Sequence, residues 1–200
     1  MAENKFRNLP PKRTYEGKEL ADYKRYKDTL SKDFNERCGY TDCPQFWFGG
    51  KRNFQIDHFM SKSHHPELET KYSNLVYSCS YVNRAKSDDI GCYIDPCDTD
   101  YNEHFYRDDL GNIFPKENSP SAKYMYNKLK LFLKRYGIIW MIDQLEQRMF
   151  KLQELIETTD NAEAKVLFIE IGMKYNNYKK YLRAEQWKTK NFLARIIPQQ

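Results

Sequence analysis

The pattern of apolar and polar residues predicts a helix near the start of the chain, after an irregular arm over residues 1–14. Over residues 17–37, side chains that can form an apolar face recur every three or four positions, at Leu20, Tyr23, Tyr26 or Lys27, Leu30 and Phe34. This is the period of an amphipathic helix. The segment Cys38-Gly39-Tyr40 then breaks the pattern.

Two strands and a short helix are predicted next. The run Phe46-Trp47-Phe48, the pair Gly49-Gly50 and the run Asn53-Phe54-Gln55-Ile56 are typical of two strands joined by a turn. We expect the second strand to end at Asp57-His58. A polar loop follows, Asn74 opens the apolar run Leu75-Val76-Tyr77, and residues 78–88 can form a helix with Ser78 or Ser80 as its cap.

The second half predicts a hairpin and then helices. Residues 104–106 and 108–114 together are typical of a hairpin whose turn contains Gly111. From Ala122 to Ile197 there is no proline, and apolar residues recur at helical spacing. We expect a long helix, with a break at Gly137, a turn over residues 158–161 capped by Thr159 or Asp160, and a second helix. The apolar positions of the second helix are Val166, Ile169, Met173, Tyr181, Trp187 and Leu193.

Charge is unevenly distributed along the 200 residues, whose net charge is +5. Residues 121–200 hold 15 Lys and Arg against 8 Asp and Glu, a net of +7, and the remainder has a net of −2. A basic helical region suits a polyanionic partner, although a solvated lysine-rich surface would give the same count. With no long apolar run and five cysteines, we expect a cytoplasmic protein without a membrane span or disulfide framework.

One short segment, residues 54–88, concentrates the chemistry. It holds an acid, a histidine, two amides and a lysine, at Asp57, His58, Asn74, Asn83 and Lys86. Such a set can bind a divalent cation, deprotonate a water and contact a phosphate. Histidine suits general-base catalysis because its pKa lies near neutrality, so we assign that role to His58, although a lone histidine is more often a packed or surface residue.

This order, Asp-His, then Asn, then Asn-x-x-Lys, resembles the HNH nuclease family. The ending Asn83-Arg84-Ala85-Lys86-Ser87-Asp88 is similar to that of the HNH domain of RNA-guided DNA-cutting effectors. The resemblance covers residues 38–100 and implies an α+β fold, a ββα-metal HNH nuclease core with an N-terminal helix and a C-terminal helical hairpin. We expect the boundaries to be 1–37, 38–118 and 119–200.

The resemblance also implies the roles of the site residues. Asp57 and Asn83 would bind one Mg²⁺ or Mn²⁺, because a shell of oxygen ligands favours these ions. Asn74 would hold the loop that orients His58. Lys86 would contact a phosphate, with Arg84 and Lys62 as weaker candidates. His64 and His65 are left out as solvent-facing, and His104 is interpreted as structural.

The chain departs from many HNH proteins in its cysteines. A structural zinc would need two C-x-x-C pairs. Here the first pair is Cys38 and Cys43. In the second pair, Cys79 is present, but the position three residues later is Val82, which cannot ligate. Either the zinc is lost or Cys92 or Cys97 substitutes; we favour loss, with the cysteines as small buried hydrophobes.

The later segments resemble a narrower HNH subgroup, the nuclease subunits of Septu-type antiphage systems and of retrons that pair them with an ATPase. That resemblance implies a DNA endonuclease in antiphage defence, restrained until infection, with the tail docked on the ATPase. Double-strand cleavage would need a homodimer, a second visit or a partner. Two alternatives stay open: a nucleic-acid-binding module with a dead site, and an assembly subunit that acts on RNA or tRNA.

Overall fold

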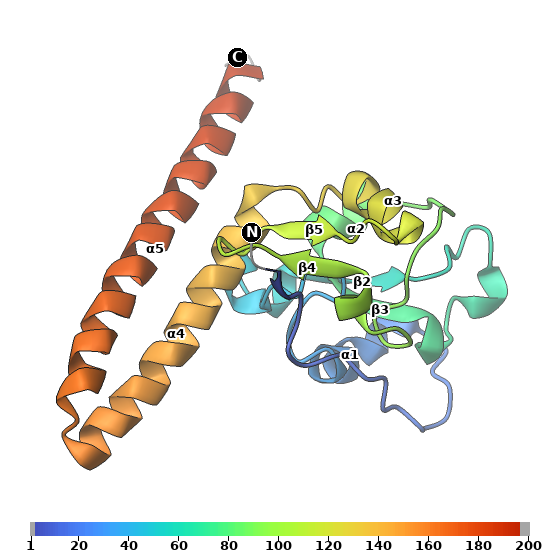
Figure 1. Cartoon of the computed structure of the whole chain (residues 1–200). Helices are drawn as coiled ribbons and strands as arrows, with labels where there is room; N and C mark the ends of the chain where they lie inside the picture. The colour runs from blue at the N-terminus through green and yellow to red at the C-terminus, as the bar shows by residue number, and fades with distance from the viewer. Residues whose placement is uncertain (1–2, 197–200) are drawn as a thin grey trace. The chain divides into compact units, whose positions relative to one another are not determined.

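The structure is a computed structural model that describes the backbone of residues 3–196 and the side chains of residues 3–184. It divides into two compact units, Met1–Tyr136 and Gly137–Gln200. The fold is mixed α and β, with two small sheets and several helices (Figure 1). This agrees with the predicted α+β class. No helix within the described part of the chain has the length and apolar character needed to cross a membrane.

The first sheet pairs β2 (Phe54–His58) with β3 (Leu75–Cys79) in antiparallel register, with Asp57 opposite Val76 and His58 opposite Leu75. All five residues of β3 are buried, as expected for a strand covered on both faces. The chain continues directly from β3 into α2 (Ser80–Lys86), which contacts both strands, and α1 (Lys27–Asp33) contacts β3. The result is a strand, a 16-residue loop over residues 59–74, a strand and a helix.

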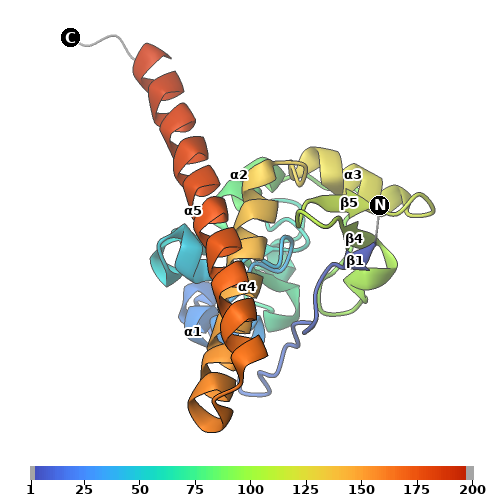
Figure 2. The ribbon, with the colours of Figure 1, turned by 60° about the vertical axis from the view of Figure 1, so that its left-hand side comes forward.

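The second sheet has three strands in the order β1-β4-β5 (Figure 2). β4 (Phe105–Arg107) and β5 (Ile113–Pro115) form the predicted hairpin, and Asp108 Oδ1 accepts from the amides of Leu110 and Asn112 to close its turn. The N-terminal arm adds β1 (Asn4–Lys5) beside β4, so the expectation of a wholly irregular arm was wrong.

Buried Arg107 connects this second sheet to the rest of the first unit. Its guanidinium donates to the carbonyl oxygens of Phe6, Gly111 and Thr41, at 2.9, 2.7 and 2.6 Å. Burying an ionic group is costly unless its hydrogen bonds are made. The three carbonyls therefore fix the position of the arm, the hairpin turn and the loop that follows Cys38.

The N-terminal helix is shorter than the predicted range 17–37. A 3-10 turn over Tyr23–Tyr26 leads into α1, and the Asp22 carboxylate accepts from the amide of Lys24 at the start of that turn. The helix stops at Asp33 because Asn35 and Glu36 take positive φ. Local side-chain capping and left-handed residues therefore set both ends.

The predicted strand Phe46-Trp47-Phe48 is wrong. Gln45–Phe48 is a 3-10 helix that follows Pro44, and a second 3-10 turn spans Lys51–Asn53. Gly49 lies at φ 87°, and the Asn53 amide donates to the Phe48 carbonyl at 2.7 Å. Short turns with side-chain hydrogen bonds outcompete β propensity here, and β3 takes the place of the missing strand.

The C-terminal helices are α3 (Pro120–Lys128), α4 (Lys134–Thr159) and α5 (Ala162–Ile196). The predicted break at Gly137 is wrong: the chain breaks over residues 129–133, where Lys130 lies at φ 55°. The turn between α4 and α5 is at the predicted place, but Asn161 rather than Thr159 or Asp160 caps α5, accepting from Ala164 N at 2.9 Å. The side chains of Trp187 and Leu193 lie outside the described residues.

Candidate active site

Four of the residues singled out from the sequence line one open pocket of about 310 Å³: Asp57, His58, Lys62 and Asn83. Asp57 and His58 are the last two residues of β2, and Asn83 lies on α2. Neighbouring residues within a strand point to opposite faces. At the end of β2 this restriction is relaxed, and Asp57 and His58 both line the pocket. The fold thus gathers residues that lie up to 26 positions apart in the sequence.

The His58 ring is held at both of its sides. Nε2 lies 2.9 Å from the Glu69 carbonyl oxygen, and the Tyr23 ring packs edge-on with its centroid 4.6 Å away. A carbonyl oxygen can only accept, so we assign the proton to Nε2, which places the lone pair of the neutral imidazole on Nδ1. Burial lowers the pKa of His58. The hydrogen bond to the Glu69 carbonyl acts in the opposite direction on this pKa, and burial outweighs it. The lowered pKa favours a neutral ring at pH 7, with Nδ1 able to accept a proton.

Asn74 binds the loop that follows His58 through its side chain. Its Oδ1 accepts from Met60 N at 2.7 Å, and its Nδ2 donates to the carbonyls of Met60 and Leu68 at 3.0 and 3.3 Å. Its own carbonyl accepts from Phe59 N at 2.8 Å. The side chain therefore joins both ends of the loop that supplies the Glu69 carbonyl to His58.

Asp57 is buried, and two groups bind its carboxylate. The Tyr40 hydroxyl donates to Oδ2 at 2.6 Å, and Lys86 Nζ lies 3.3 Å from Oδ1 and 3.2 Å from Oδ2. Burial raises the pKa of Asp57 to about 6, against the opposing effects of Lys86 and Tyr40. The same burial, with the charge of Asp57, raises the pKa of Tyr40.

The structure places Lys86 away from the predicted phosphate position. The side chain is fully buried, and Nζ also donates to the His58 carbonyl at 2.6 Å. The Tyr93 ring covers it, with the ring centroid 5.1 Å from Nζ. Lys86 therefore faces the carboxylate and backbone at the end of β2, and we correct its role to that of a positioning residue.

Asn83 and Asp57 have the chemistry of a hard-cation site. The Asn83 amide nitrogen donates to Gln55 Oε1 at 2.7 Å, which orients the amide oxygen as the donor for a cation. One carboxylate and one amide oxygen fit Mg²⁺ or Mn²⁺, which retain several waters and take substrate phosphate as a ligand. One feature opposes the fit, because the Lys86 ammonium beside Asp57 repels a second cation.

The two remaining basic candidates differ in position. Lys62 lines the pocket, forms an ion pair with Glu69 at 2.8 Å and lies 5.0 Å from the Tyr23 ring centroid. Arg84 is exposed on α2, donates to the Ser80 carbonyl at 3.2 Å and lies over Tyr81. Arg84 is thus not among the residues that line the pocket.

Sequence reasoning missed a basic extension of this pocket. An adjoining pocket of about 470 Å³ shares Tyr23, Ile56 and Asn83 with the first, and adds Lys24, Lys27 and Arg52 to its wall. We name the two pockets together the basic groove. Lys24 and Lys27 are three positions apart on consecutive helical turns, and this spacing was the available signal. Arg52 is brought in by the 3-10 turn that replaced the predicted strand.

The cysteines and His104 lie outside the pocket. Cys38, Cys43 and Cys79 are buried, as is Val82, and Cys38 Sγ accepts from Cys79 N at 3.4 Å. Within the described part of the chain, no three His, Cys, Asp or Glu side chains are grouped so that they could hold a metal. His104 Nδ1 lies 2.8 Å from Ser119 Oγ, the cap of α3, which agrees with a structural role.

Comparison of the chain with protein-family models and with curated proteins gives no match.

Proposed function

We propose that this protein is a metal-dependent HNH endonuclease that hydrolyses DNA phosphodiester bonds, and that β2, β3 and α2 form its ββα-metal core. The observation that supports this most is the pocket that Asp57, His58 and Asn83 line together, which forms one part of the basic groove. A general base, two hard oxygen donors and a basic path are the components that hydrolysis of a polyanionic phosphodiester needs.

In the proposed reaction, His58 Nδ1 takes a proton from a water molecule as the water oxygen attacks phosphorus. The bond from phosphorus to the 3′ oxygen breaks, and that oxygen receives a proton from solvent. A cation held by Asp57 and Asn83, when bound, neutralises phosphate charge and stabilises the leaving oxygen. Asn74 and the Glu69 carbonyl keep the His58 ring in its orientation, and Lys86 fixes Asp57.

The basic groove gives the substrate its place. Lys24, Lys27 and Arg52 line one of its two pockets, and Lys62 lines the other together with His58. A strand that follows the groove therefore passes basic side chains in both pockets. Phosphate contacts of this kind are sequence-independent and weaken with salt. We therefore expect binding to fall steeply between about 50 and 200 mM salt.

A matched set of DNA and RNA substrates tests the proposal. Purified protein is incubated with single- and double-stranded DNA and RNA of the same sequence, with Mg²⁺, Mn²⁺ or EDTA. We expect metal-dependent cleavage of DNA. The double variant Lys24→Gln with Arg52→Gln should cleave more slowly, and the control double variant Lys5→Gln with Lys18→Gln, at residues outside both pockets, should cleave at the wild-type rate. Cleavage of RNA alone would replace DNA as the substrate, and no cleavage with either metal would contradict a self-sufficient enzyme.

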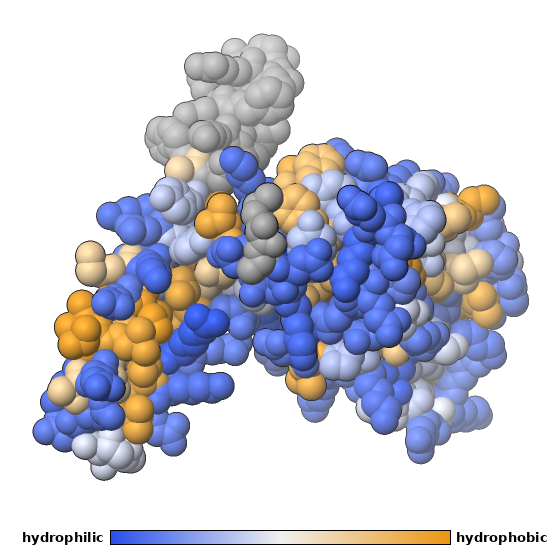
Figure 3. All heavy atoms as spheres, in the orientation of Figure 1, coloured by the Kyte–Doolittle hydropathy of each residue, from blue (hydrophilic) through white to orange (hydrophobic). Residues whose placement is uncertain are grey.

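The helices α4 and α5 support a second part of the proposal, docking of a partner subunit such as the ATPase that the resemblance implies. Apolar side chains gather on this hairpin (Figure 3), with Phe150, Val166, Ile169 and Met173 between 59 and 66% exposed. Purification of the tagged full chain and a search for a co-purifying ATPase, with Ile169→Lys as the disrupting variant, tests this part. Co-purification that the variant leaves unchanged would contradict it.

A further inference from the structure

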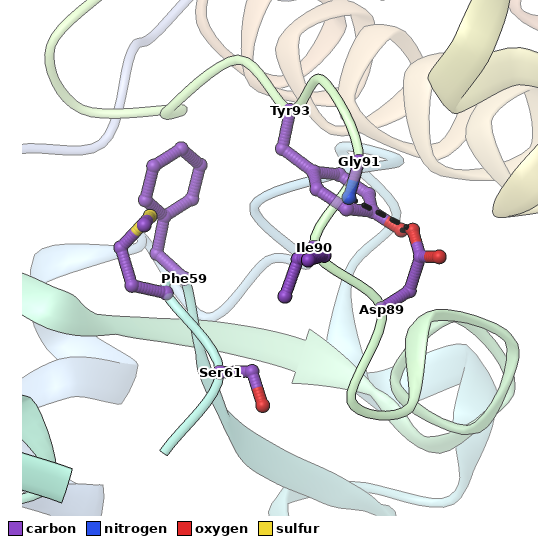
Figure 4. Close-up of a pocket in the computed structure, with 7 residues that line it drawn as sticks. Phe59, Ser61, Asp89, Ile90, Gly91 and Tyr93 are labelled. Atoms are coloured by element: carbon purple, nitrogen blue, oxygen red, sulfur yellow. Dashed lines mark hydrogen bonds between the residues drawn. The ribbon is translucent and has the colours of Figure 1, made fainter. Parts of the chain in front are cut away.

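A third, smaller pocket of about 100 Å³ lies beside the pocket that His58 lines, and Ser61 lines both. Its walls come from two segments (Figure 4). Phe59 and Met60 follow directly after His58, and Asp89, Ile90 and Tyr93 follow α2. The pocket is therefore built by the segment that follows β2 and the segment that follows α2, the two elements that carry Asp57, His58 and Asn83.

Apolar side chains supply most of the walls of the small pocket, and Ser61 and Asp89 are its two small polar side chains. Phe59, Met60, Ile90 and Tyr93 supply rings and aliphatic surface, and Met60 and Ile90 are 40 and 67% exposed. The volume is too small for a whole nucleotide, since it corresponds to about three water molecules. It suits the edge of one planar ring, which aromatic and apolar side chains can hold by stacking.

Asp89 is the charged residue of the small pocket, and its carboxylate is held in a fixed orientation. Oδ2 accepts from the hydroxyls of Tyr93 (2.7 Å) and Tyr124, and from Gly91 N at 3.2 Å, while Lys128 Nζ lies 3.5 Å from Oδ1. The two tyrosine hydrogen bonds, Tyr124 first, lower the pKa of Asp89 to about 2. The group is therefore an ionised acceptor at neutral pH, and it repels a phosphate.

From the shared wall, the apolar ring surface and the fixed acceptor, we propose that the small pocket takes one nucleobase adjacent to the scissile phosphate, with an exocyclic amino group facing Asp89. A carboxylate accepts from the N4 amino group of cytosine, whereas thymine presents an acceptor oxygen at that position. Cytosine, with a single ring, fits the volume best. This inference rests on the proposed nuclease function, since it names a subsite of the same centre.

The pocket also defines the form of substrate. A base that enters it must leave its stack, which costs least in single-stranded, nicked or mismatched nucleic acid. We therefore expect single-stranded or distorted DNA to bind better than a perfect duplex of the same length.

Binding tests the pocket without requiring cleavage. Fluorescence anisotropy is measured on the His58→Ala variant with short single strands that carry cytosine, thymine or an abasic site at one position. The cytosine strand is expected to bind on the order of tenfold more tightly than the thymine strand. Asp89→Asn removes this difference, and Asp109→Asn, at an exposed carboxylate of the β4–β5 turn, retains it.

Ile90→Ala keeps the test independent of the Asp89 network, because Ile90 is exposed and makes wall surface only. It is expected to reduce the advantage of base over abasic strand about threefold, and Leu110→Ala, at a comparably exposed apolar residue, leaves it unchanged. Equal binding of cytosine, thymine and abasic strands would overturn the inference, as would equal effects of the Ile90 and Leu110 variants.

Cleavage by the wild type separates this inference from the proposed function. Sequencing of the cut ends from a random library is expected to show cytosine enriched at one position next to the cut, and Asp89→Asn loses the enrichment but still cuts. Cutting without any enrichment overturns the subsite and leaves the nuclease. Base-dependent binding without cutting overturns the nuclease and leaves a base-binding site.

Discussion

The two units of this protein differ in the charged side chains that the first buries and in the apolar side chains that gather, exposed, on the helices of the second. The first unit buries Arg7, Lys86, Arg107 and Asp57, each of which is at most 4% exposed, and gives each one a polar partner. The second unit leaves Phe150, Val166, Ile169 and Met173 at least 59% exposed. Buried ions with hydrogen bonds fix a geometry, whereas a large exposed apolar face is typical of an interaction surface.

This difference shows which unit holds its side chains in fixed positions. The active-site candidates of the first unit are held by groups that the same unit supplies, such as Asn74, Tyr40 and Lys86. The hairpin of α4 and α5 has internal contacts, including the hydrogen bond of 2.9 Å from the Tyr175 hydroxyl to Glu146, but the four apolar side chains named above remain exposed. Substitutions should therefore act on folding and chemistry in the first unit and on association in the second.

The largest effect is expected from Lys86→Met. Loss of the ammonium leaves Asp57 buried beside Tyr40 without its cationic partner, and we expect the free energy of unfolding to fall by about 3–5 kcal/mol. Urea denaturation monitored by circular dichroism measures it, with the exposed Lys24→Met as the matched control. The double variant Lys86→Met with Asp57→Asn should recover much of the loss, and additive losses would contradict the pairing.

Asn74→Ala should have the next largest effect. It removes three side-chain hydrogen bonds inside the loop over residues 59–74 and leaves buried backbone groups unpaired, which costs about 1–3 kcal/mol. Cleavage should fall about 10–100-fold, as for other groups that only orient a catalytic side chain. Asn53→Ala, which affects a hydrogen bond to Phe48 away from the pocket, should leave cleavage unchanged. Equal activity of the two variants would contradict the role of Asn74.

The pH dependence separates chemistry from stability in the first unit. His58 must be neutral, with its pKa below 6.5, and Asp57 must be ionised, with a pKa of about 6. Activity should therefore fall steeply as the pH drops below about 6, with up to two protons involved. A flat rate from pH 5 to 8 would contradict both assignments.

The two groups act oppositely on stability over the same range. The folded pKa of Asp57 lies above its ordinary value of 3.8, so its contribution to stability is full below pH 3.8 and is lost as the pH rises through about 6. The folded pKa of His58 lies below 6.5, so its contribution is present above 6.5 and is lost on acidification. The two partly cancel, and in Asp57→Asn stability should decline more steeply as the pH falls from 6.5 to 4.

The smallest effect on stability is expected in the second unit. Ile169→Ala, at a side chain 62% exposed, should change the free energy of unfolding by less than about 0.5 kcal/mol. Leu30→Ala, at a fully buried side chain of α1, should cost about 2–5 kcal/mol. A loss above about 1 kcal/mol at Ile169 would show that the hairpin face is covered within the chain.

The sequence predicted those parts of the fold where one local signal acts alone. The β4–β5 hairpin followed from its Gly-containing turn, and the α4–α5 turn followed from residues 158–161. The strand at Phe46-Trp47-Phe48 failed because Pro44, Gly49 and the Asn53 side chain impose tight turns that aromatic β propensity does not reveal. Likewise, the sequence did not reveal that β2 pairs with β3, because strands separated by the 16-residue loop 59–74 have no short-range pairing signal.

The candidate site was predicted in part for the same reason. The types and order of Asp57, His58, Asn74 and Asn83 identified residues that the fold brings to one pocket or to the loop behind it. The role of Lys86 depended on which way its side chain points, and helical spacing places a lysine on a face without saying whether that face is buried. Tyr40, Lys24 and Arg52 come from elements whose approach to β2 is set by tertiary packing.

Cleavage of supercoiled plasmid by the purified full chain tests the central claim most directly. The assay compares the wild type, His58→Ala and His64→Ala, an exposed histidine six residues away, each with Mg²⁺, Mn²⁺ and EDTA. The account predicts metal-dependent nicking or linearisation that His64→Ala retains and that His58→Ala reduces by about 10²–10⁴-fold. Cleavage by His58→Ala at the wild-type rate would contradict the assignment of the base and, with it, the proposed active site.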